Sequence, residues 1–295
     1  MTSGNGTRRA GMLDPHKPAI IIPAYNEAHS IATLLEAVNP GVLLGHYSVL
    51  VACNGCTDAT AEIVRREFPQ VHCLDIQRAG KTHAINEAEK LDLGYPRIYV
   101  DADVSIDDIS LLHLLDQCRE NSSDTDPVVV APEGIMDMAR SSYLVRCYYA
   151  AWQKTRFCSD FGYGAGVYGL NRAARERFTQ FPDIISDDGY VRAVFGYENI
   201  VVSRKSQSRV VAPKGILDLL KIKTRSKLGK LQLLQLAECH TPKTRSHAVF
   251  TQRPSMLELL VYYGINALSY LNAWRYRYGN ARYRWQRDES SRELA

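Results

Sequence analysis

A buried-strand pattern followed by a helical pattern recurs along the first half of this chain, about every 25–30 residues. In the first unit, the apolar run 19–22 stops at Pro23, and Asn26 or Ser30 can cap a helix that continues to about Val38. The same analysis predicts strands at 47–52, 71–76, 97–100 and 128–131, and helices at 59–68, 82–91, 109–119 and 189–195. This alternation predicts an α/β fold in which helices cover both faces of a mostly parallel sheet.

The charge distribution divides the chain into two parts. Residues 1–203 contain 18 Lys and Arg against 26 Asp and Glu, whereas residues 204–295 contain 18 against 6. We therefore expect a folded α/β domain at 18–213 and a basic helical region at 214–295. Residues 1–17 have no apolar stretch of the kind a secretory signal needs, so we expect a disordered leader there. The basic region predicts an anionic partner, such as a membrane surface, a phosphate-bearing substrate or nucleic acid, and a merely solvated basic face is the alternative.

The cysteines and the hydropathy of the chain indicate where in the cell the protein is expected. The seven cysteines are odd in number and scattered, which favours reduced thiols and a cytoplasmic protein. Cys53 and Cys56 form a CxxC pair without a second pair at ligand spacing, so we do not expect a zinc site. No run of 18 uncharged apolar residues is present, so a transmembrane helix is not expected.

The segment 256–274 combines apolar residues at helical spacing with tyrosines, and basic and aromatic residues follow it. This pattern predicts an interfacial helix that holds the protein peripherally on an anionic membrane, in a cytoplasmic protein its inner face. A helix packed on the domain or in a homodimer is the alternative. Interleaved basic and aromatic residues also suit single-stranded nucleic acid, but we do not expect a nucleic-acid partner.

Polar clusters follow three of the predicted strands. They are Tyr25-Asn26-Glu27, Asn54-Gly55 and Asp101-Ala102-Asp103. In parallel sheets, ligands bind at the carboxyl ends of the strands. Two carboxylates on one side of a strand end are suitable ligands for Mg²⁺ or Mn²⁺ that carries diphosphate oxygens, although an acidic helix-capping loop would look the same.

Two further motifs carry charge at predicted helix starts. Lys81 follows Gly80 and can meet a phosphate there, unless it is an ordinary surface lysine. Ser186-Asp187-Asp188 precedes a helical stretch, and its acids are either caps or a general base for an acceptor hydroxyl.

The segment 164–169 matches a dinucleotide fingerprint in its letters alone. It lies in mid-chain, inside the aromatic and glycine-rich stretch 161–170, rather than after the first strand. We therefore do not expect NAD binding. Close approach of the backbone to a polar ligand is the better use of these glycines.

Taken in their order, these motifs resemble the inverting family 2 glycosyltransferases of the GT-A fold. The matching segments are 22–27, 51–58, Gly80-Lys81 with Ala84 and Asn86, 101–103, 162–169 and 186–188, and the resemblance covers about 18–235. It implies transfer of a sugar from a nucleotide-sugar donor to a hydroxyl acceptor in glycan, glycolipid or glycosylated-metabolite biosynthesis. The Gln-x-x-Arg-Trp motif of processive members is missing, so processivity is not expected.

The resemblance also implies roles for single residues. Pro23, Ala24, Tyr25 and Glu27 would border the nucleoside, and Asn54 stands where the family usually has an acid that contacts the base. Lys81 would lie near the phosphates. Asp101, Ala102 and Asp103 would lie near the ribose and the metal ion, and Asp103 and Asp101 would bind that Mn²⁺ or Mg²⁺ ion. Asp187 and Asp188 would form the catalytic motif, with Asp188 as the favoured base. A UDP-sugar is the favoured donor and a GDP-sugar the second choice.

Two other function classes compete with this interpretation. A related nucleotidyltransferase would usually show a glycine-rich phosphate loop directly after the first strand, where this chain has Pro23-Ala24-Tyr25. A non-catalytic partner that binds nucleotide sugars in a glycan-assembly complex would not need Asp101, Asp103 and Asp188.

Overall fold

The computed structural model describes residues 11, 13–120, 126–160, 166–236 and 250–278. Its strands are β1 Ala19–Ala24, β2 Ser48–Asn54, β3 His72–Ile76, β4 Arg97–Val100, β5 Val129–Asp137, β6 Val167–Leu170 and β7 Ile200–Val211. Its helices are α1 Ile31–Leu43, α2 Thr60–Glu67, α3 Lys81–Ala88, α4 Asp108–Glu120, α5 Tyr143–Gln153, α6 Arg156–Asp160, α7 Arg172–Arg175, α8 Asp187–Phe195, α9 Ile216–Leu233 and α10 Met256–Tyr278, with a 3₁₀ turn, η1, at Tyr197–Asn199.

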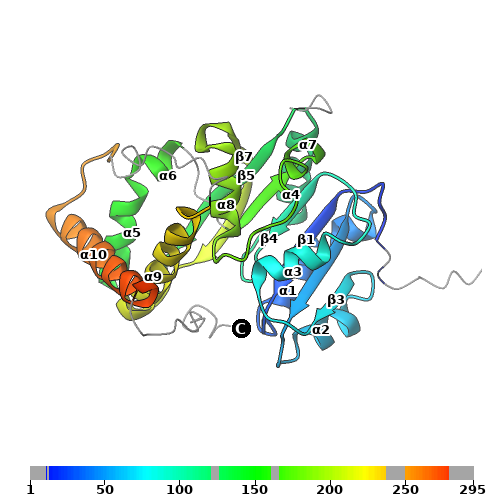
Figure 1. Ribbon diagram of the computed structural model, residues 1–295, viewed down its shortest axis with the longest axis horizontal. Helices are drawn as coiled ribbons and strands as arrows, with labels where there is room; N and C mark the ends of the chain where they lie inside the picture. Colours follow the sequence, from blue (N-terminus) through cyan, green and yellow to red (C-terminus); the bar gives the residue numbers. More distant parts are fainter. Residues whose placement is uncertain (1–10, 12, 121–125, 161–165, 237–249, 279–295) are drawn as a thin grey trace, which may run out of the picture.

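The strands form one sheet in the order β3-β2-β1-β4-β6-β5-β7 (Figure 1). β1 pairs in parallel with β2 and β4, and β2 pairs in parallel with β3. β6 is antiparallel to both of its neighbours, β4 and β5, and β7 pairs in parallel with β5. The predicted α/β class, with a mostly parallel sheet, is therefore confirmed.

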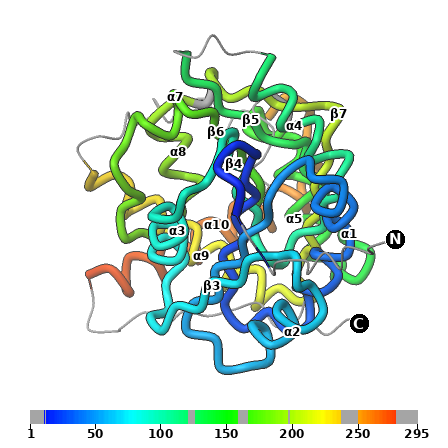
Figure 2. The backbone as a smooth tube through the Cα atoms, turned by 90° about the vertical axis from the view of Figure 1, so that its right-hand side faces the viewer, coloured from blue at the N-terminus to red at the C-terminus, as the bar shows by residue number. Residues whose placement is uncertain are grey.

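Helices cover both faces of the sheet because successive strand residues point to opposite sides. Ile20 and Ile22 of β1 pack against α1 and α4, whereas Ile21 packs on the other side with α3 and α8. Figure 2 shows α3 and α8 on one side of the sheet and α1 and α4 on the other. Because both faces of β1 are buried, it is apolar along its whole length instead of alternating.

The helices α5, α9 and α10 form a third apolar cluster at one end of the molecule (Figure 1). Tyr148 of α5, Leu219 of α9 and Ile265 of α10 are buried in it. The basic C-terminal region is helical as predicted, over α9 and α10.

Several elements differ from the prediction. The first helix has its N-cap at Ser30 as predicted but continues past Pro40 to Leu43 instead of ending at about Val38, and the strand expected at 128–131 extends to Asp137. The strands β6 and β7 and the helices α5, α6 and α7 were not predicted. Residues 1–10 and 12, most of the predicted leader, lie outside the described residues.

Candidate active site

The carboxyl ends of β1 and β2 are joined to the start of α3 by one side chain. Asn54 Nδ2 donates to the carbonyl oxygen of Ala24 (2.8 Å), and Asn54 Oδ1 accepts from the backbone N–H of Gly80 (2.9 Å). The asparagine is 2% exposed, and its amide oxygen and nitrogen are both hydrogen-bonded to backbone. The predicted residues Pro23, Ala24, Asn54 and Lys81 therefore lie along one edge of the sheet.

The loops that follow β1 and β2 are tied to each other. Asn26 adopts a left-handed backbone conformation (φ 52°), and its Oδ1 accepts from the N–H of Thr57 (2.6 Å). The Glu27 N–H donates to Thr60 Oγ1 (2.7 Å), and the Glu27 carboxylate accepts from Ser30 Oγ (3.0 Å). These bonds fix the segment that carries Tyr25 and Glu27 directly after Ala24.

Lys81 is the cation at the centre of the site. Its Nζ lies 2.5 Å from Asp101 Oδ1 and 2.6 Å from Asp187 Oδ1, so one ammonium group joins the Asp-x-Asp segment to the Ser-Asp-Asp segment. Burial alone would lower the pKa of Lys81, but Asp101, Asp187 and Asp188 outweigh it and raise that pKa above its usual value. Lys81 therefore stays charged, and two of the predicted clusters meet on it.

Asp187 is the buried member of the acidic pair at the start of α8. Its side chain is 1% exposed, and besides Lys81 it accepts a hydrogen bond from the Tyr168 hydroxyl (2.9 Å). Burial and the charge of Asp187 raise the pKa of Tyr168, so the phenol keeps the proton that it donates. Both oxygens of Asp187 are thus engaged by protein groups.

Asp188 is more accessible, with a side chain 26% exposed. Its Oδ1 accepts from Ser186 Oγ (2.8 Å) and from the Gly189 N–H (2.7 Å), and its Oδ2 pairs with Arg192 one turn further along α8. Burial would raise the pKa of Asp188, but Arg192 and Lys81 together lower it to about 2. Asp188 is therefore ionised at neutral pH.

The Asp-x-Asp segment lies directly after β4. Ala102 packs into the core, whereas Asp101 is partly exposed and Asp103 is exposed. Burial, Asp187 and Asp103 raise the pKa of Asp101 to about 6 against the opposing effect of Lys81. Negative charge accumulates here in excess of what Lys81 neutralises.

This donor set fits a divalent metal. Carboxylate oxygens are the ligands that Mg²⁺ and Mn²⁺ prefer, and crowded carboxylates with a raised pKa favour a bound cation. Within the described ranges, no group of three or more His, Cys, Asp or Glu side chains is arranged to hold a metal. Asp101 and Asp103 alone supply only part of the oxygen ligands that such an ion takes.

The glycine-rich segment approaches the same place. Gly166 has a left-handed backbone (φ 66°), its carbonyl accepts from the Asp101 N–H (2.8 Å), and a Cβ at this position would lie 2.9 Å from Asp101 Oδ2. Gly169 instead packs in the sheet, where a Cβ would lie 2.4 Å from Ile98 Cδ1. Gly164 lies outside the described residues, and the glycines that are described serve close packing.

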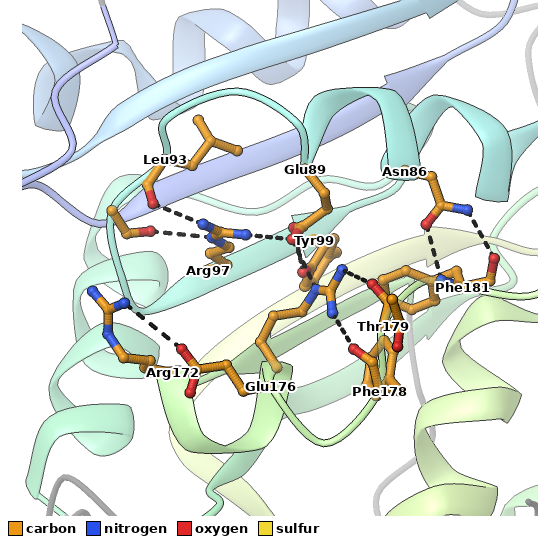
Figure 3. A network of polar contacts seen from close by, with 12 residues as sticks. Asn86, Glu89, Leu93, Arg97, Tyr99, Arg172, Glu176, Phe178, Thr179 and Phe181 are labelled. Atoms are coloured by element: carbon orange, nitrogen blue, oxygen red, sulfur yellow. Dashed lines mark hydrogen bonds and ion pairs between the residues drawn. The ribbon is translucent and has the colours of Figure 1, made fainter.

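A buried polar network supports the site from behind (Figure 3). Glu89 pairs with Arg97 and with Arg175 (2.8 Å) and accepts from the Tyr99 hydroxyl (2.7 Å). The Tyr99 ring stacks on Tyr168 at 4.8 Å, and Tyr168 holds Asp187. The network therefore positions the ring whose hydroxyl binds Asp187.

A second support in Figure 3 starts from α3. Asn86 exchanges two hydrogen bonds with the backbone of Phe181, at 2.8 and 2.9 Å. These bonds anchor the loop that leads to Ser186. Asn86, which the sequence comparison with family 2 glycosyltransferases singled out, therefore has a structural role here.

Three residues of this arrangement were missed from the sequence. Arg192 could have been found, because a cation four residues after Asp188 on a helix faces it. Tyr168 and Glu89 gave no local signal, since their partners belong to other elements and lie 8 to 86 residues away, beyond the three- or four-residue spacing of a helix.

The sheet order, the helical layers and the acidic cluster at β4 define a GT-A-type fold. Residues 19–177 match the profile of the family described as "Glycosyl transferase family 2", and the chain belongs to this family. Among the described residues, no helix is long and apolar enough to cross a membrane.

Two solved structures are similar in fold. The mannosyltransferase PcManGT from Pyrobaculum calidifontis, in complex with GDP-Man and Mn²⁺, has a TM-score of 0.57 and 17% identity over 92% of this chain and 79% of that one. Glucosyl-3-phosphoglycerate synthase from Mycobacterium tuberculosis, in complex with Mn²⁺, UDP and glucosyl-3-phosphoglycerate, has a TM-score of 0.53 and 17% identity over 78% of this chain and 82% of that one.

Two curated proteins match over shorter stretches. The succinoglycan biosynthesis protein ExoA of Rhizobium meliloti is 39% identical over 72 residues, 23% of this chain and 22% of that protein. Glycosyltransferase AglD of Haloferax volcanii is 29% identical over 114 residues, 36% of this chain and 18% of that protein. The matched part is thus about a fifth of each relative.

Proposed function

We propose that this protein transfers a sugar from a nucleotide-sugar donor to an acceptor hydroxyl, with inversion at the anomeric carbon. The observation that carries the proposal is the position of Lys81 between Asp101 and Asp187. It brings the segment suited to a metal and diphosphate into contact with the segment suited to a base. Family membership supports the same activity.

In this proposal, different residues bind different parts of the donor. Pro23, Ala24, Tyr25, Glu27 and Asn54 border the nucleoside, and Lys81, paired with Asp101 and Asp187, lies near the diphosphate. Asp101 and Asp103 would hold Mn²⁺ or Mg²⁺, which when bound stabilises negative charge on the departing diphosphate.

Asp188 takes the proton of the acceptor hydroxyl while the acceptor oxygen forms its bond to the anomeric carbon. The bond from that carbon to the diphosphate oxygen breaks, and its electron pair leaves with the nucleoside diphosphate. Arg192 and Ser186 orient the Asp188 carboxylate.

A binding experiment tests the donor. Purified protein is heated with UDP-sugars and GDP-sugars, with Mn²⁺, Mg²⁺ or EDTA, because a ligand that binds only the folded state raises the melting temperature. The UDP-sugars are the first candidates, and the similar structures with UDP and GDP-Man support testing both bases. If no nucleotide sugar raises the melting temperature and no nucleoside diphosphate is released, the proposed function is wrong.

Removal of the metal site is the first prediction. Asp103→Ala should slow transfer roughly 10²-fold or more, because the charge on the leaving diphosphate loses its stabilisation. Release of nucleoside diphosphate is measured with and without EDTA. Asp116→Ala, at an exposed surface pair with Arg119, is the control and should stay near the wild-type rate. Full activity of the wild type in EDTA, or full activity of Asp103→Ala, would contradict the role of the metal.

The outer face of α10 supports a second proposal, on location. Ile265, Ser269 and Ala273 face the protein, whereas Met256, Leu260, Leu271, Trp274 and Tyr278 are each at least 60% exposed. Arg275 and Arg277 lie at the end of the helix. We propose that this face binds an anionic membrane surface, since each basic residue near such a surface contributes about 1 kcal/mol.

Vesicle flotation tests this location. The protein should float with anionic vesicles, less at high salt, and hardly with neutral ones. Leu260→Asp with Leu271→Asp should abolish flotation, whereas Leu43→Asp, at a 61% exposed position on α1, should not. If the protein ignores vesicles and instead forms a dimer that the α10 variants dissociate, the packed-helix alternative is correct.

A further inference from the structure

Three thiols lie together at the carboxyl end of β2, on the face of the sheet that α2 covers. The sulfurs of Cys53 on β2 and Cys73 on β3 are 3.9 Å apart. Cys56, in the loop after β2, hydrogen-bonds through its sulfur to Cys53. We call these three residues the thiol cluster. The proposed transfer of a sugar gives none of them a role.

The turn after β2 brings Cys56 to the carboxyl end of β1. Gly55 makes this turn with a left-handed backbone (φ 59°), and its N–H donates to the carbonyl oxygen of Ile76 (2.7 Å). Cys56 Sγ then accepts from the Asn26 N–H (3.3 Å) and donates to the carbonyl oxygen of Ala24 (3.5 Å). The thiol cluster is therefore bonded directly to the segment that we assign to the nucleoside.

The bond between Asn26 and Cys56 helps to hold an unusual backbone conformation. A left-handed φ, such as the 52° of Asn26, is uncommon for a residue other than glycine and persists where neighbouring contacts fix it. The Asn26 N–H is bound by Cys56, and Asn26 Oδ1 accepts from the N–H groups of Thr57 (2.6 Å) and Asp58 (3.3 Å). A Cys56 sulfur that moves away would therefore loosen the loop between β1 and α1.

Cys56 and Cys53 differ in exposure and in protonation. Cys56 is half-buried beside the exposed Thr57, whereas Cys53 is fully buried. Hydrogen bonds with Cys53 and with the Asn26 N–H lower the pKa of Cys56 to about 6 against the effect of burial. Hydrogen bonds with Cys56 and Cys73, together with burial, raise the pKa of Cys53. An accessible thiolate beside a second thiol is the arrangement in which oxidation proceeds to a disulfide.

We propose that Cys56 is a peroxide-sensitive thiol, and that its disulfide with Cys53 weakens donor binding. The Cys56 thiolate attacks hydrogen peroxide, the O–O bond breaks, and a sulfenic acid forms while hydroxide leaves and takes up a proton. The Cys53 thiol then attacks the Cys56 sulfur, the S–S bond forms, and the S–O bond breaks to release water with the Cys53 proton. The two sulfurs are oxidised, and the peroxide is reduced to water.

The disulfide changes what Cys56 offers to the end of β1. Its sulfur has no proton left for the Ala24 carbonyl oxygen, and an S–S bond of about 2.05 Å draws it toward Cys53 and away from the Asn26 N–H. We expect the oxidised chain to bind nucleoside diphosphate with Mn²⁺ roughly tenfold more weakly, about the effect of one hydrogen bond left unmade. This inference rests on the proposed function, because it assigns a regulation to the proposed nucleoside site.

Peptide mapping tests the disulfide without any nucleotide. The reduced full chain is treated with hydrogen peroxide, its free thiols are alkylated, and its tryptic peptides are analysed by mass spectrometry. No Lys or Arg lies between Cys53 and Cys56, whereas two arginines lie between Cys56 and Cys73, so trypsin leaves the pair on one peptide and Cys73 on another. We expect a disulfide within the first peptide that dithiothreitol removes, while Cys158, half-buried outside the thiol cluster, is still alkylated.

Serine variants separate the roles of the two thiols. Cys53→Ser should stop the reaction at the Cys56 sulfenic acid, which dimedone traps. Cys56→Ser should leave Cys53 reduced and should keep donor binding, because a hydroxyl can still donate to Ala24 and accept from Asn26. Cys158→Ser is the matched control and should form the disulfide as the wild type does.

Two measurements on the reduced and the oxidised chain test the consequence. Hydrogen–deuterium exchange at 25–28 should become faster on oxidation in the wild type but not in Cys56→Ser, and calorimetric titration should show the weaker binding of nucleoside diphosphate. A disulfide that joins the two peptides, or equal exchange and equal affinity in both forms, would overturn the proposal. If the reduced chain binds no nucleoside diphosphate, the proposed function fails, while the peptide map and the exchange rates still decide the fate of Cys56.

Discussion

Asp188→Asn should leave donor binding intact and slow transfer roughly 10²–10⁴-fold. The substitution keeps the size of the side chain and removes the group that accepts the proton. Of the two acids at the start of α8, Asp188 is the more accessible one, with a side chain 26% exposed, and its carboxylate is ionised at neutral pH. Donor affinity from thermal shift and single-turnover rates of transfer measure the two effects separately.

Asp187→Asn is the matched comparison. Asp187 is 1% exposed and bound by Lys81 and Tyr168, so its loss should lower stability more than it changes the proton transfer itself. If the folded Asp187→Asn variant is inactive while Asp188→Asn is active, the assignment of the base is reversed. If neither substitution slows transfer, the inverting mechanism with this base is wrong.

The stability of Asp188→Asn carries a pH signature. The folded-state pKa of Asp188 is lowered to about 2, so ionised Asp188 stabilises the fold above the unfolded-state pKa of about 4. That contribution is lost as the pH falls from about 4 to about 2. The gap in melting temperature between wild type and Asp188→Asn should therefore be larger at pH 7 than at pH 3.

The strands that the sequence predicted well are those buried on both faces. β1, β2 and β4 are short apolar runs. β1 ends at the turn after Ala24, β2 ends at Asn54 and β4 ends directly before Asp101, so the apolar pattern and the residues that follow it give the position of each strand. Their shared carboxyl edge follows from parallel pairing alone. This is why Lys81 and Asp101 could be expected near each other.

The missed strands do not show that pattern. β7 contains Arg204, Lys205 and buried Ser203, Ser206 and Ser208, so it looks like a charged loop although β5 pairs with it. β6 lies in a glycine-rich stretch, and only its packing between β4 and β5 makes it a strand. Tertiary contacts override local propensity in both cases.

The sequence indicated which residues form the candidate site better than it indicated the contacts between them. Asp187 is buried against Tyr168 and Lys81, which reach α8 from β6 and α3. The stacking of Tyr99 on Tyr168 and the Glu89 network belong to the same tertiary arrangement. Spacing along the chain cannot show such contacts.

Lys81→Met should destabilise the fold by about 3–5 kcal/mol, because it leaves Asp187 buried without its cation. For a domain of this size, that corresponds to a fall in melting temperature of roughly 6–20 °C. Lys90→Met is the control, since Lys90 is 67% exposed and its pair with Glu87 lies on the surface. Such a surface pair contributes about 0–1 kcal/mol.

The double variant Lys81→Met with Asp187→Asn decides whether charge is the cause. If the loss comes from an uncompensated carboxylate, neutralising Asp187 should recover part of the melting temperature that Lys81→Met removes. If the losses simply add, the Lys81 stem matters through its packing and not through its charge. A Lys81→Met variant that melts within about 2 °C of wild type would show that Asp187 becomes protonated at little cost, and that the contact between the two segments is weaker than its geometry indicates.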